Sequence, residues 1–195
     1  NFNLNSDNFS LNFDRLEKTI SKQRIKILLI NFPNNPTGKM LNKNELNQLV
    51  EIVFKYKLIV ITDEVYDRLI FSKKKYRSIA SFKKISNQVI VINSFSKSFA
   101  MTGWRVGFMV ANKSIIKKAC KIQQHINTNV PEFIQLAAYK ALTINPKHLE
   151  KYNTRLLNNY NYLIRRFDKT INFPVSKSEG GLFAFVNISK YGKCS

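Results

Sequence analysis

Cysteine and histidine are scarce in this 195-residue sequence. It contains 2 cysteines and 2 histidines, and Cys120 and Cys194 lie far apart without the spacing of metal ligands. The sequence therefore supports neither a disulfide framework nor a zinc site. His125 and His148 have no carboxylate or cysteine partner in the local pattern, so we expect both to be structural or exposed.

Long apolar runs are also absent. No uninterrupted apolar segment approaches the length of a membrane span, and no segment of the leader type opens the sequence. We therefore expect a cytoplasmic protein without a membrane partner. The sequence starts at Asn1 and stops at Ser195, just after a strand-like segment, so we expect a fragment of a longer protein.

Acidic residues are few compared with basic ones. Twelve acidic residues stand against 32 lysines and arginines, which gives a formal net charge of +20. Such a charge can indicate a nucleic-acid surface. However, the lysines are scattered, and no helix collects basic side chains on one side with aromatic residues between them. Because Lys, Asn and Ile share A/T-rich codons, we interpret the charge as a base-composition bias and expect no nucleic-acid partner.

Strand-like and helix-like segments alternate along the chain, which predicts an α/β fold: a mostly parallel sheet with flanking helices. Apolar, β-branched runs predict buried strands at 25–30, 58–62, 89–93 and 106–110, and two further strands are expected at 171–174 and 180–186. Apolar side chains at helical spacing predict helices near 12–20, 42–56, 113–124, 131–142 and 146–167. We expect 25–30 to be a central strand covered on both faces, 66–82 to be a surface excursion, and Trp104 to pack in the core.

The segment between the strands at 89–93 and 106–110 carries the strongest chemical signal. Ser94 and Ser96 place two hydroxyls beside Lys97, and Arg105 follows eight residues later. A partly desolvated lysine near another cation loses its proton more easily, and a neutral lysine can form an imine. Hydroxyls and a guanidinium are groups that bind phosphate. Pyridoxal 5′-phosphate is a cofactor that requires both kinds of group.

Two other predicted strands end in polar groups. The loop 31–38 is rich in asparagine and proline and contains Asn35, while Asp63 and Tyr66 follow the strand at 58–62. The carboxyl ends of parallel strands are where such sheets gather ligands. An acidic pair after an apolar strand is also typical of ATPases, but the required phosphate loop is absent, because Gly38-Lys39 is followed by methionine.

Together these segments resemble the class I/II aminotransferases, the fold-type I pyridoxal-phosphate enzymes, and most closely the bacterial aspartate and aspartate/prephenate types. The resemblance is carried by Asn35-Pro36-Thr37-Gly38, Asp63 to Tyr66, Ser94 to Lys97, and Arg105, in the family's order. It implies an α/β/α cofactor-binding large domain over 1–150 that lacks its N-terminal part. It also implies a linking helix and the start of a small C-terminal α+β domain over 151–195.

The resemblance assigns seven residues to cofactor binding. They are Asn35, Asp63, Tyr66, Ser94, Ser96, Lys97 and Arg105. Lys97 is the imine-forming and catalytic lysine, and the two serines and the arginine bind the phosphate. The aspartate pairs with the pyridine nitrogen, while the tyrosine and the asparagine bind the phenolic oxygen; Asn35 also helps to hold the substrate carboxylate. No metal is implied.

The activity implied is amino transfer between an amino acid, with aspartate favoured, and a 2-oxo acid, with 2-oxoglutarate favoured. The family also implies a homodimer for the full-length protein. An aromatic, alanine or prephenate aminotransferase, a lyase of the same fold type, and a non-catalytic basic remnant stay open as alternatives. Because other family site residues would lie outside this sequence, we expect the 195 residues alone to be inactive.

Overall fold

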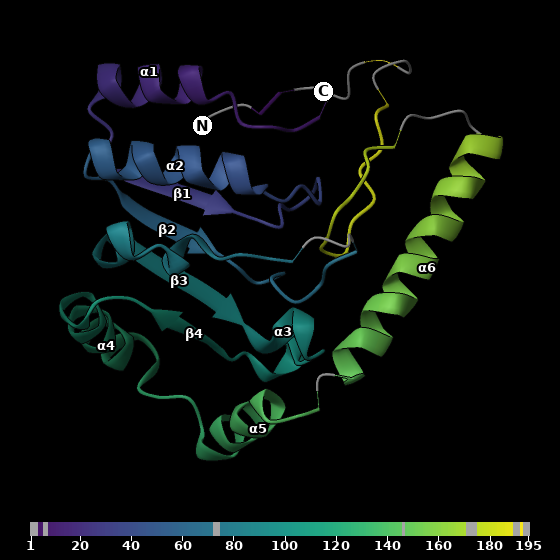
Figure 1. Ribbon diagram of the computed structural model, residues 1–195. Helices are drawn as coiled ribbons and strands as arrows, with labels where there is room; N and C mark the ends of the chain where they lie inside the picture. Colours follow the sequence, from purple (N-terminus) through teal and green to yellow (C-terminus); the bar gives the residue numbers. More distant parts are fainter. Residues whose placement is uncertain are drawn as a thin grey trace.

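The computed structural model describes residues 4–5, 8–71, 75–145, 147–170, 175–188 and 192. It contains a four-stranded sheet with helices beside it (Figure 1). The strands are β1 (Ile27–Asn31), β2 (Ile59–Asp63), β3 (Val89–Ser94) and β4 (Gly107–Val110). The helices are α1 (Phe13–Gln23), α2 (Lys43–Lys55), α3 (Phe95–Ser98), α4 (Lys113–Asn127), α5 (Glu132–Leu142) and α6 (Lys147–Thr170), with 3-10 turns at Ile79–Ser81, Lys83–Gln88 and Thr102–Trp104.

The sheet is mostly parallel, as predicted. Its order is β1-β2-β3-β4, with β1, β2 and β3 parallel and β4 antiparallel to β3. Asn31 pairs with Asp63, and Asp63 pairs with Ile92. Paired residues of neighbouring strands point to the same side of a sheet. The carboxyl ends of the three parallel strands therefore meet at one edge, where β1, β2 and β3 all point in Figure 1.

The helix α2 begins as its sequence predicts. The Asn42 side chain accepts a hydrogen bond from the Glu45 backbone at 3.0 Å, and the Glu45 carboxylate accepts one from the Asn42 backbone at 2.7 Å. This reciprocal cap satisfies amide groups that the first turn of a helix leaves without partners. The start of α1 is capped by Asn12, whose side chain accepts from the Arg15 backbone at 2.9 Å.

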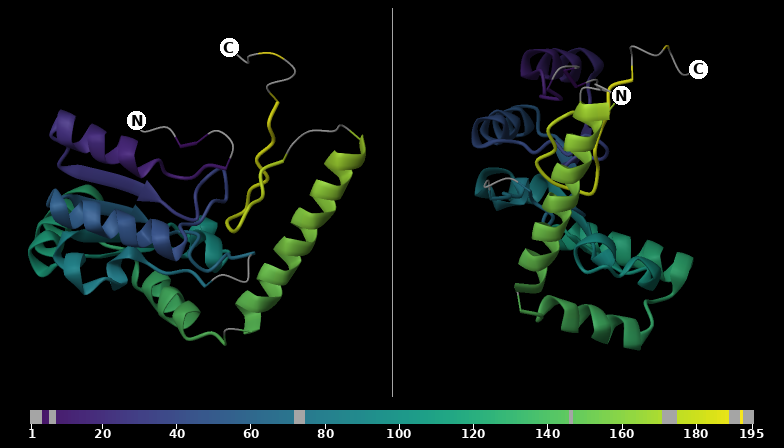
Figure 2. Two further views of the ribbon diagram at one scale, coloured as in Figure 1. Left: turned by 45° about the horizontal axis from the view of Figure 1, so that its top comes forward. Right: turned by 90° about the vertical axis from the view of Figure 1, so that its right-hand side faces the viewer.

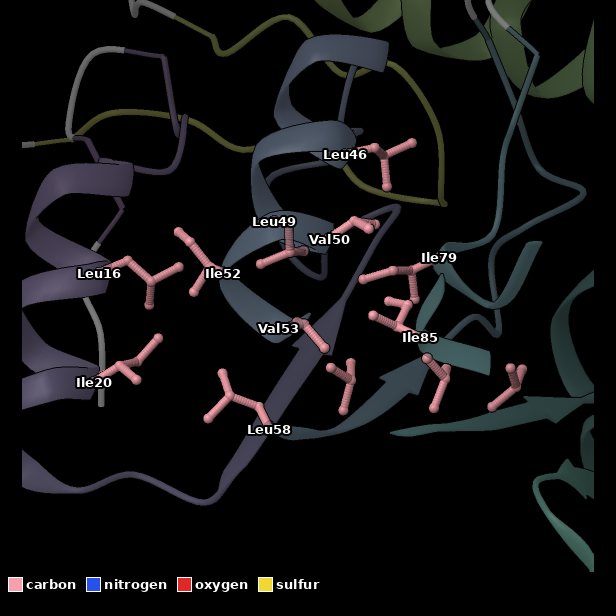
Figure 3. Close-up of a cluster of buried hydrophobic side chains, with 13 residues drawn as sticks. Leu16, Ile20, Leu46, Leu49, Val50, Ile52, Val53, Leu58, Ile79 and Ile85 are labelled. Atoms are coloured by element: carbon pink, nitrogen blue, oxygen red, sulfur yellow. The ribbon is translucent and has the colours of Figure 1, made fainter. Parts of the chain in front are cut away.

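The main core lies between α2 and one face of the sheet. The α2 side chains of Leu49 and Val53 are fully buried there, and α1 packs against α2 through Leu16 and Ile20 (Figure 3). The strands contribute their alternate positions, among which Val60 is fully buried. Because strand side chains alternate between faces, this core uses one face of the sheet.

The opposite face of the sheet is exposed within the part of the chain that the structure describes. Ile27 is 57% exposed, Leu29 70% and Ile92 44%. The expectation that 25–30 is a central strand covered on both faces is therefore wrong for the described residues: β1 is an edge strand with one covered face. An apolar run predicts that both faces prefer burial, but it does not identify the polypeptide that buries them.

Three further expectations can be compared with the structure. The excursion 66–82 is not all on the surface, because Leu69 is fully buried and Ile79 is 2% exposed. Trp104 does not pack in the core, since it is 42% exposed. His125 and His148 are both exposed, as expected.

The last described segment, 175–188, lies beside the carboxyl edge of the sheet, between the strand ends and α6 (Figures 1 and 2). The predicted strand at 180–186 is absent as a regular strand; isolated bridges join Ile70 to Gly180 and Val175 to Val186 instead. Part of the chain predicted to start the small domain, 171–174, lies outside the described residues. Among the helices described, none has the length and apolar character needed to cross a membrane.

Candidate active site

The turn after β3 positions Lys97. Ser94 ends the strand and caps α3, because its hydroxyl accepts a hydrogen bond from the Ser96 backbone at 3.1 Å. The two serine hydroxyl oxygens lie 2.9 Å apart, so they form one polar pair. Lys97, in the middle of α3, is half-buried, and its amine donates no hydrogen bond to any described residue. The amine is therefore available to bind another group.

A close approach between β3 and β4 brings Arg105 back to this turn. Ser94 pairs with Gly107, where an added Cβ would lie 2.7 Å from the Asn93 carbonyl oxygen, so a side chain at this position would push the strands apart. Arg105 adopts a left-handed backbone with φ of 53°, and its guanidinium donates to the Thr102 carbonyl at 3.1 Å. One guanidinium and two hydroxyls are thus attached to the same turn.

The end of the neighbouring strand β2 carries Asp63 and Tyr66. The Asp63 carboxylate accepts a hydrogen bond from the Val65 backbone at 3.1 Å. Tyr66 is 3% exposed; burial raises the pKa of its hydroxyl, and the negative charge of Asp63 raises that pKa further. The Tyr66 hydroxyl therefore stays protonated at neutral pH and can act as a hydrogen-bond donor.

The loop after β1 is tied to Asp63 through Asn31. The Asn31 side chain donates to the Asp63 carbonyl at 3.1 Å and accepts from the Asn35 backbone at 2.8 Å. Asn34 closes the loop by accepting a hydrogen bond from the Thr37 hydroxyl at 2.8 Å. The Asn35 side chain is exposed, and its side-chain nitrogen Nδ2 donates no hydrogen bond to the described residues. It can therefore bind an added ligand.

The structure thus places all the predicted site residues at the carboxyl ends of the adjacent strands β2 and β3 or on the segments that follow β1, β2 and β3. By strand alternation and register, Asp63, Ile92 and Ser94 point to the sheet face opposite α2. The donor set fits pyridoxal 5′-phosphate chemically. It contains an amine without a hydrogen-bond partner in the part of the chain that the structure describes, a protonated phenol beside a carboxylate, and hydroxyls with a guanidinium that suit a phosphate group.

The family of the chain follows from a comparison of its sequence with family profiles. The profile described as "Aminotransferase class I and II" matches residues 1–194, which is nearly all of the chain. The chain belongs to this aminotransferase family. Members of the family depend on pyridoxal phosphate, which agrees with the donor set at the strand ends.

Individual aminotransferases resemble the chain over about half of their own length. An aspartate aminotransferase of Pyrococcus abyssi is 38% identical over 189 residues, which are 96% of this chain and 48% of that protein. An aromatic-amino-acid aminotransferase of Thermococcus litoralis is 34% identical over the same shares. The crystal structure of an aromatic aminotransferase from Pyrococcus horikoshii has a TM-score of 0.83 and 37% identity, over 89% of this chain and 46% of that one.

Sequence reasoning missed a buried polar cluster next to the candidate site. Glu64 is 4% exposed, and its carboxylate accepts hydrogen bonds from the Ser78 hydroxyl at 2.7 Å and the Thr62 hydroxyl at 3.2 Å. Burial raises the pKa of Glu64, although these bonds and one from Tyr76 oppose that rise. Burial also raises the pKa of Asp67, whose carboxylate is hydrogen-bonded to Asn93 on β3.

Sequence reasoning also missed the contact of the segment 175–188 with Tyr66 of the candidate site. The Phe183 ring meets the Tyr66 ring edge-on, with centroids 5.4 Å apart. The only local signal was the glycine pair Gly180-Gly181, which we interpreted as part of a strand. Gly181 has a φ of +83°, and an added Cβ there would lie 3.4 Å from Phe183.

Proposed function

We propose that the whole protein containing this chain is a pyridoxal-phosphate-dependent aminotransferase that acts on aspartate and 2-oxoglutarate. Several of the relatives that the chain covers to about half of their length are named aspartate aminotransferase, and two of them are 38% and 35% identical to the chain. The observation that carries the proposal is the amine of Lys97, which has no hydrogen-bond partner among the described residues. Lys97 lies on α3, directly after β3, and β3 is the neighbour of the strand that ends in Asp63.

In this proposal the chain holds the cofactor at three points. The hydroxyls of Ser94 and Ser96 and the guanidinium of Arg105 bind its phosphate. Asp63 provides the negative charge that keeps the ring nitrogen protonated, and two donors from separate loops, Asn35 and Tyr66, bind the phenolic oxygen. The neutral state of the Tyr66 phenol supports this last assignment, because only a protonated phenol donates.

The chemical work of the chain centres on Lys97. When bound, pyridoxal phosphate supplies an acceptor for the electrons left at the substrate α-carbon. Lys97 anchors the cofactor before substrate arrives, removes the α-proton as a base, and returns that proton as an acid. Asn35 helps to hold the substrate carboxylate and thereby fixes the α-carbon within reach of the amine. Ser94, Ser96 and Arg105 bind and orient, and move no proton.

An aromatic amino acid is the second candidate substrate. The aromatic-amino-acid aminotransferase of T. litoralis matches the chain over the same 189 residues at 34% identity, close to the 38% of the aspartate enzyme of P. abyssi. Comparing kcat/KM for aspartate and for phenylalanine, with 2-oxoglutarate as acceptor, separates the two candidates. A lyase would consume the amino acid without passing its amino group to the 2-oxo acid.

We also propose the division of the chain into a large-domain part, 1–150, and the start of a second domain, 151–195, with α6 (Lys147–Thr170) linking the two.

We further propose that the whole protein is a homodimer in the cytoplasm, where its substrates are found. Exposed apolar side chains on α4 and α5 support a subunit surface; they include Ile126, Phe133, Leu136 and Tyr139, each more than 60% exposed. Light scattering of the whole protein tests the dimer.

The activity is tested by adding pyridoxal phosphate to the whole protein and to two variants. Lys97→Ala should abolish the visible absorption of the lysine-bound cofactor and reduce amino transfer by several orders of magnitude. Lys121→Ala, which removes an exposed lysine from α4, should change neither. The proposal would be refuted by a wild-type protein that binds no cofactor, or by a Lys97→Ala variant that retains the full absorption.

A further inference from the structure

The segment 175–188 is hydrogen-bonded to the chain that follows Tyr66. The Phe71 backbone donates to the Glu179 carbonyl at 2.8 Å, and the Gly181 backbone donates to the Leu69 carbonyl at 2.8 Å. Between these bonds, Gly180 pairs with Ile70 in an antiparallel bridge. The segment is therefore fastened to the loop that carries one proposed donor to the phenolic oxygen of the cofactor.

The same segment is hydrogen-bonded to the loop that carries the other proposed donor, Asn35. The backbones of Glu179 and Gly180 both donate to the Gly38 carbonyl, at 2.9 and 3.2 Å. The Glu179 carboxylate accepts a hydrogen bond from the Met40 backbone at 2.9 Å. Glu179 thus contacts the loop of Asn35 and the residues after it with its backbone amide and its carboxylate. It contacts the chain after Tyr66 with its carbonyl.

The fit around these contacts is close. Gly38 has a φ of +68°, and a Cβ added there would collide with the Ser178 hydroxyl. A Cβ added at Gly180 would lie 2.6 Å from the Leu69 carbonyl oxygen. The segment is also held from outside, because the Tyr160 hydroxyl of α6 donates to the Ser176 carbonyl and accepts from the Ser178 backbone, both at 2.9 Å.

We propose that Glu179 is a positioning residue that holds the loops of Asn35 and Tyr66 in a fixed relation, so that both donors reach the same oxygen of the cofactor. This inference rests on the proposed function. The two donors come from loops about 30 residues apart in sequence, and Glu179 follows more than 100 residues later. A displacement of about 1 Å in such a group can reduce catalysis by about 100-fold.

The Glu179 carboxylate is the part that substitution can test, because the other two bonds use the backbone. Glu179→Ala removes the acceptor of the Met40 amide, whereas Glu179→Gln keeps an oxygen at the same distance along the side chain. Glu150→Ala removes a carboxylate from an exposed position on α6 and serves as the matched control. Circular dichroism of each variant of the whole protein checks that it is folded.

The first measurement is hydrogen exchange of a peptide spanning 33–41, in the whole protein without added cofactor. We expect faster exchange in Glu179→Ala than in the wild type, and near wild-type exchange in Glu179→Gln and Glu150→Ala. Equal exchange in all four proteins would overturn the fastening of the loop. Because no cofactor is present, this result does not depend on the proposed function.

The second measurement is the pH midpoint of the visible absorption of the lysine-bound cofactor. Donors to the phenolic oxygen stabilise its negative charge, so their displacement should let the adjacent lysine nitrogen keep its proton to higher pH. We expect the midpoint to rise by about half a unit to one unit in Glu179→Ala, with about tenfold weaker cofactor binding, as expected for one lost hydrogen bond. In Glu179→Gln, the pH midpoint and the affinity for the cofactor should both stay close to the wild-type values.

The two failures can be told apart. An unchanged midpoint and unchanged cofactor affinity in Glu179→Ala, together with faster exchange at 33–41, would refute the positioning role while the proposed function stands. No lysine-bound absorption in the wild type would refute the proposed function. In that case the exchange comparison still decides whether Glu179 fastens the loop.

Discussion

Replacing Gly38 with alanine should loosen the contact between the loop 31–38 and the segment 175–188. The φ of +68° at Gly38 lies in the left-handed region, where a side chain costs about 1–2 kcal/mol. The new Cβ would also collide with the Ser178 hydroxyl and lie 2.8 Å from the Gly180 carbonyl oxygen. Relieving this collision strains the bonds from Glu179 and Gly180 to the Gly38 carbonyl, each worth about 0.5–1.5 kcal/mol. The expected total is about 2–5 kcal/mol.

This cost can be divided by a second substitution. Ser178→Gly removes the Ser178 side chain that the Cβ meets, but it leaves the Gly180 carbonyl oxygen 2.8 Å from the Cβ and the backbone conformation of Gly38 unfavourable for alanine. Gly38→Ala should therefore cost about 1–3 kcal/mol less in the Ser178→Gly background than in the wild type, as neighbouring sites are coupled. Gly103→Ala is the matched control, because a Cβ there has no neighbour within 4 Å and its φ is not in the left-handed region.

Native-state hydrogen exchange of the whole protein measures these costs locally, as opening free energies of peptides covering 33–41 and 175–183. Gly38→Ala should lower the opening free energy of both peptides, and Gly103→Ala should leave both within about 0.5 kcal/mol of the wild type. The reasoning fails if Gly38→Ala is as harmless as the control. It also fails if the cost is the same with and without the Ser178 side chain, because the collision with that side chain would then contribute nothing.

Three other predictions concern the core, a buried carboxyl group and the phosphate. Leu49→Ala should lower the unfolding free energy by about 2–5 kcal/mol in denaturant titrations, because Leu49 is fully buried; a loss below 1 kcal/mol would contradict the described core. Burial raises the pKa of Glu64 in the folded state, so its ionisation destabilises the fold as pH rises from the ordinary pKa of glutamate to the raised one. In thermal melts between pH 4 and 8, Glu64→Gln should therefore lose the decrease in stability that the ionisation of Glu64 causes. The same pH dependence in Glu64→Gln and the wild type would contradict the raised pKa of Glu64. Arg105→Ala should weaken binding of pyridoxal phosphate by about 10–100-fold and leave binding of phosphate-free pyridoxal unchanged, whereas an equal loss for both ligands would remove Arg105 from the phosphate.

The features that local chemistry determines could be predicted from the sequence. The cap formed by Asn42 and Glu45 depends on side chains three residues apart, and the structure contains it. The order of the polar groups along the chain also predicted where they lie, because parallel strands bring their carboxyl ends to one edge. Asp63 and Ser94 lie there together on neighbouring strands.

Features that depend on distant polypeptide could not be predicted in this way. The apolar run of β1 predicted burial on both faces, but Leu29 is 70% exposed because no described helix covers that face. Trp104 is 42% exposed for a similar reason. A large apolar side chain predicts burial, but it does not identify the polypeptide that would bury it. Glu179 meets Met40 across 139 residues, and a contact at that separation leaves no period or spacing in the sequence.

The most direct test of the account is to locate the cofactor on the chain. The whole protein is incubated with pyridoxal phosphate and reduced with borohydride, which fixes the cofactor to the lysine that holds it, and its peptides are then weighed by mass spectrometry. The account predicts that the added mass lies on the peptide containing Lys97 and disappears in Lys97→Ala. Labelling that is spread over the many lysines, or concentrated on another one, would contradict it.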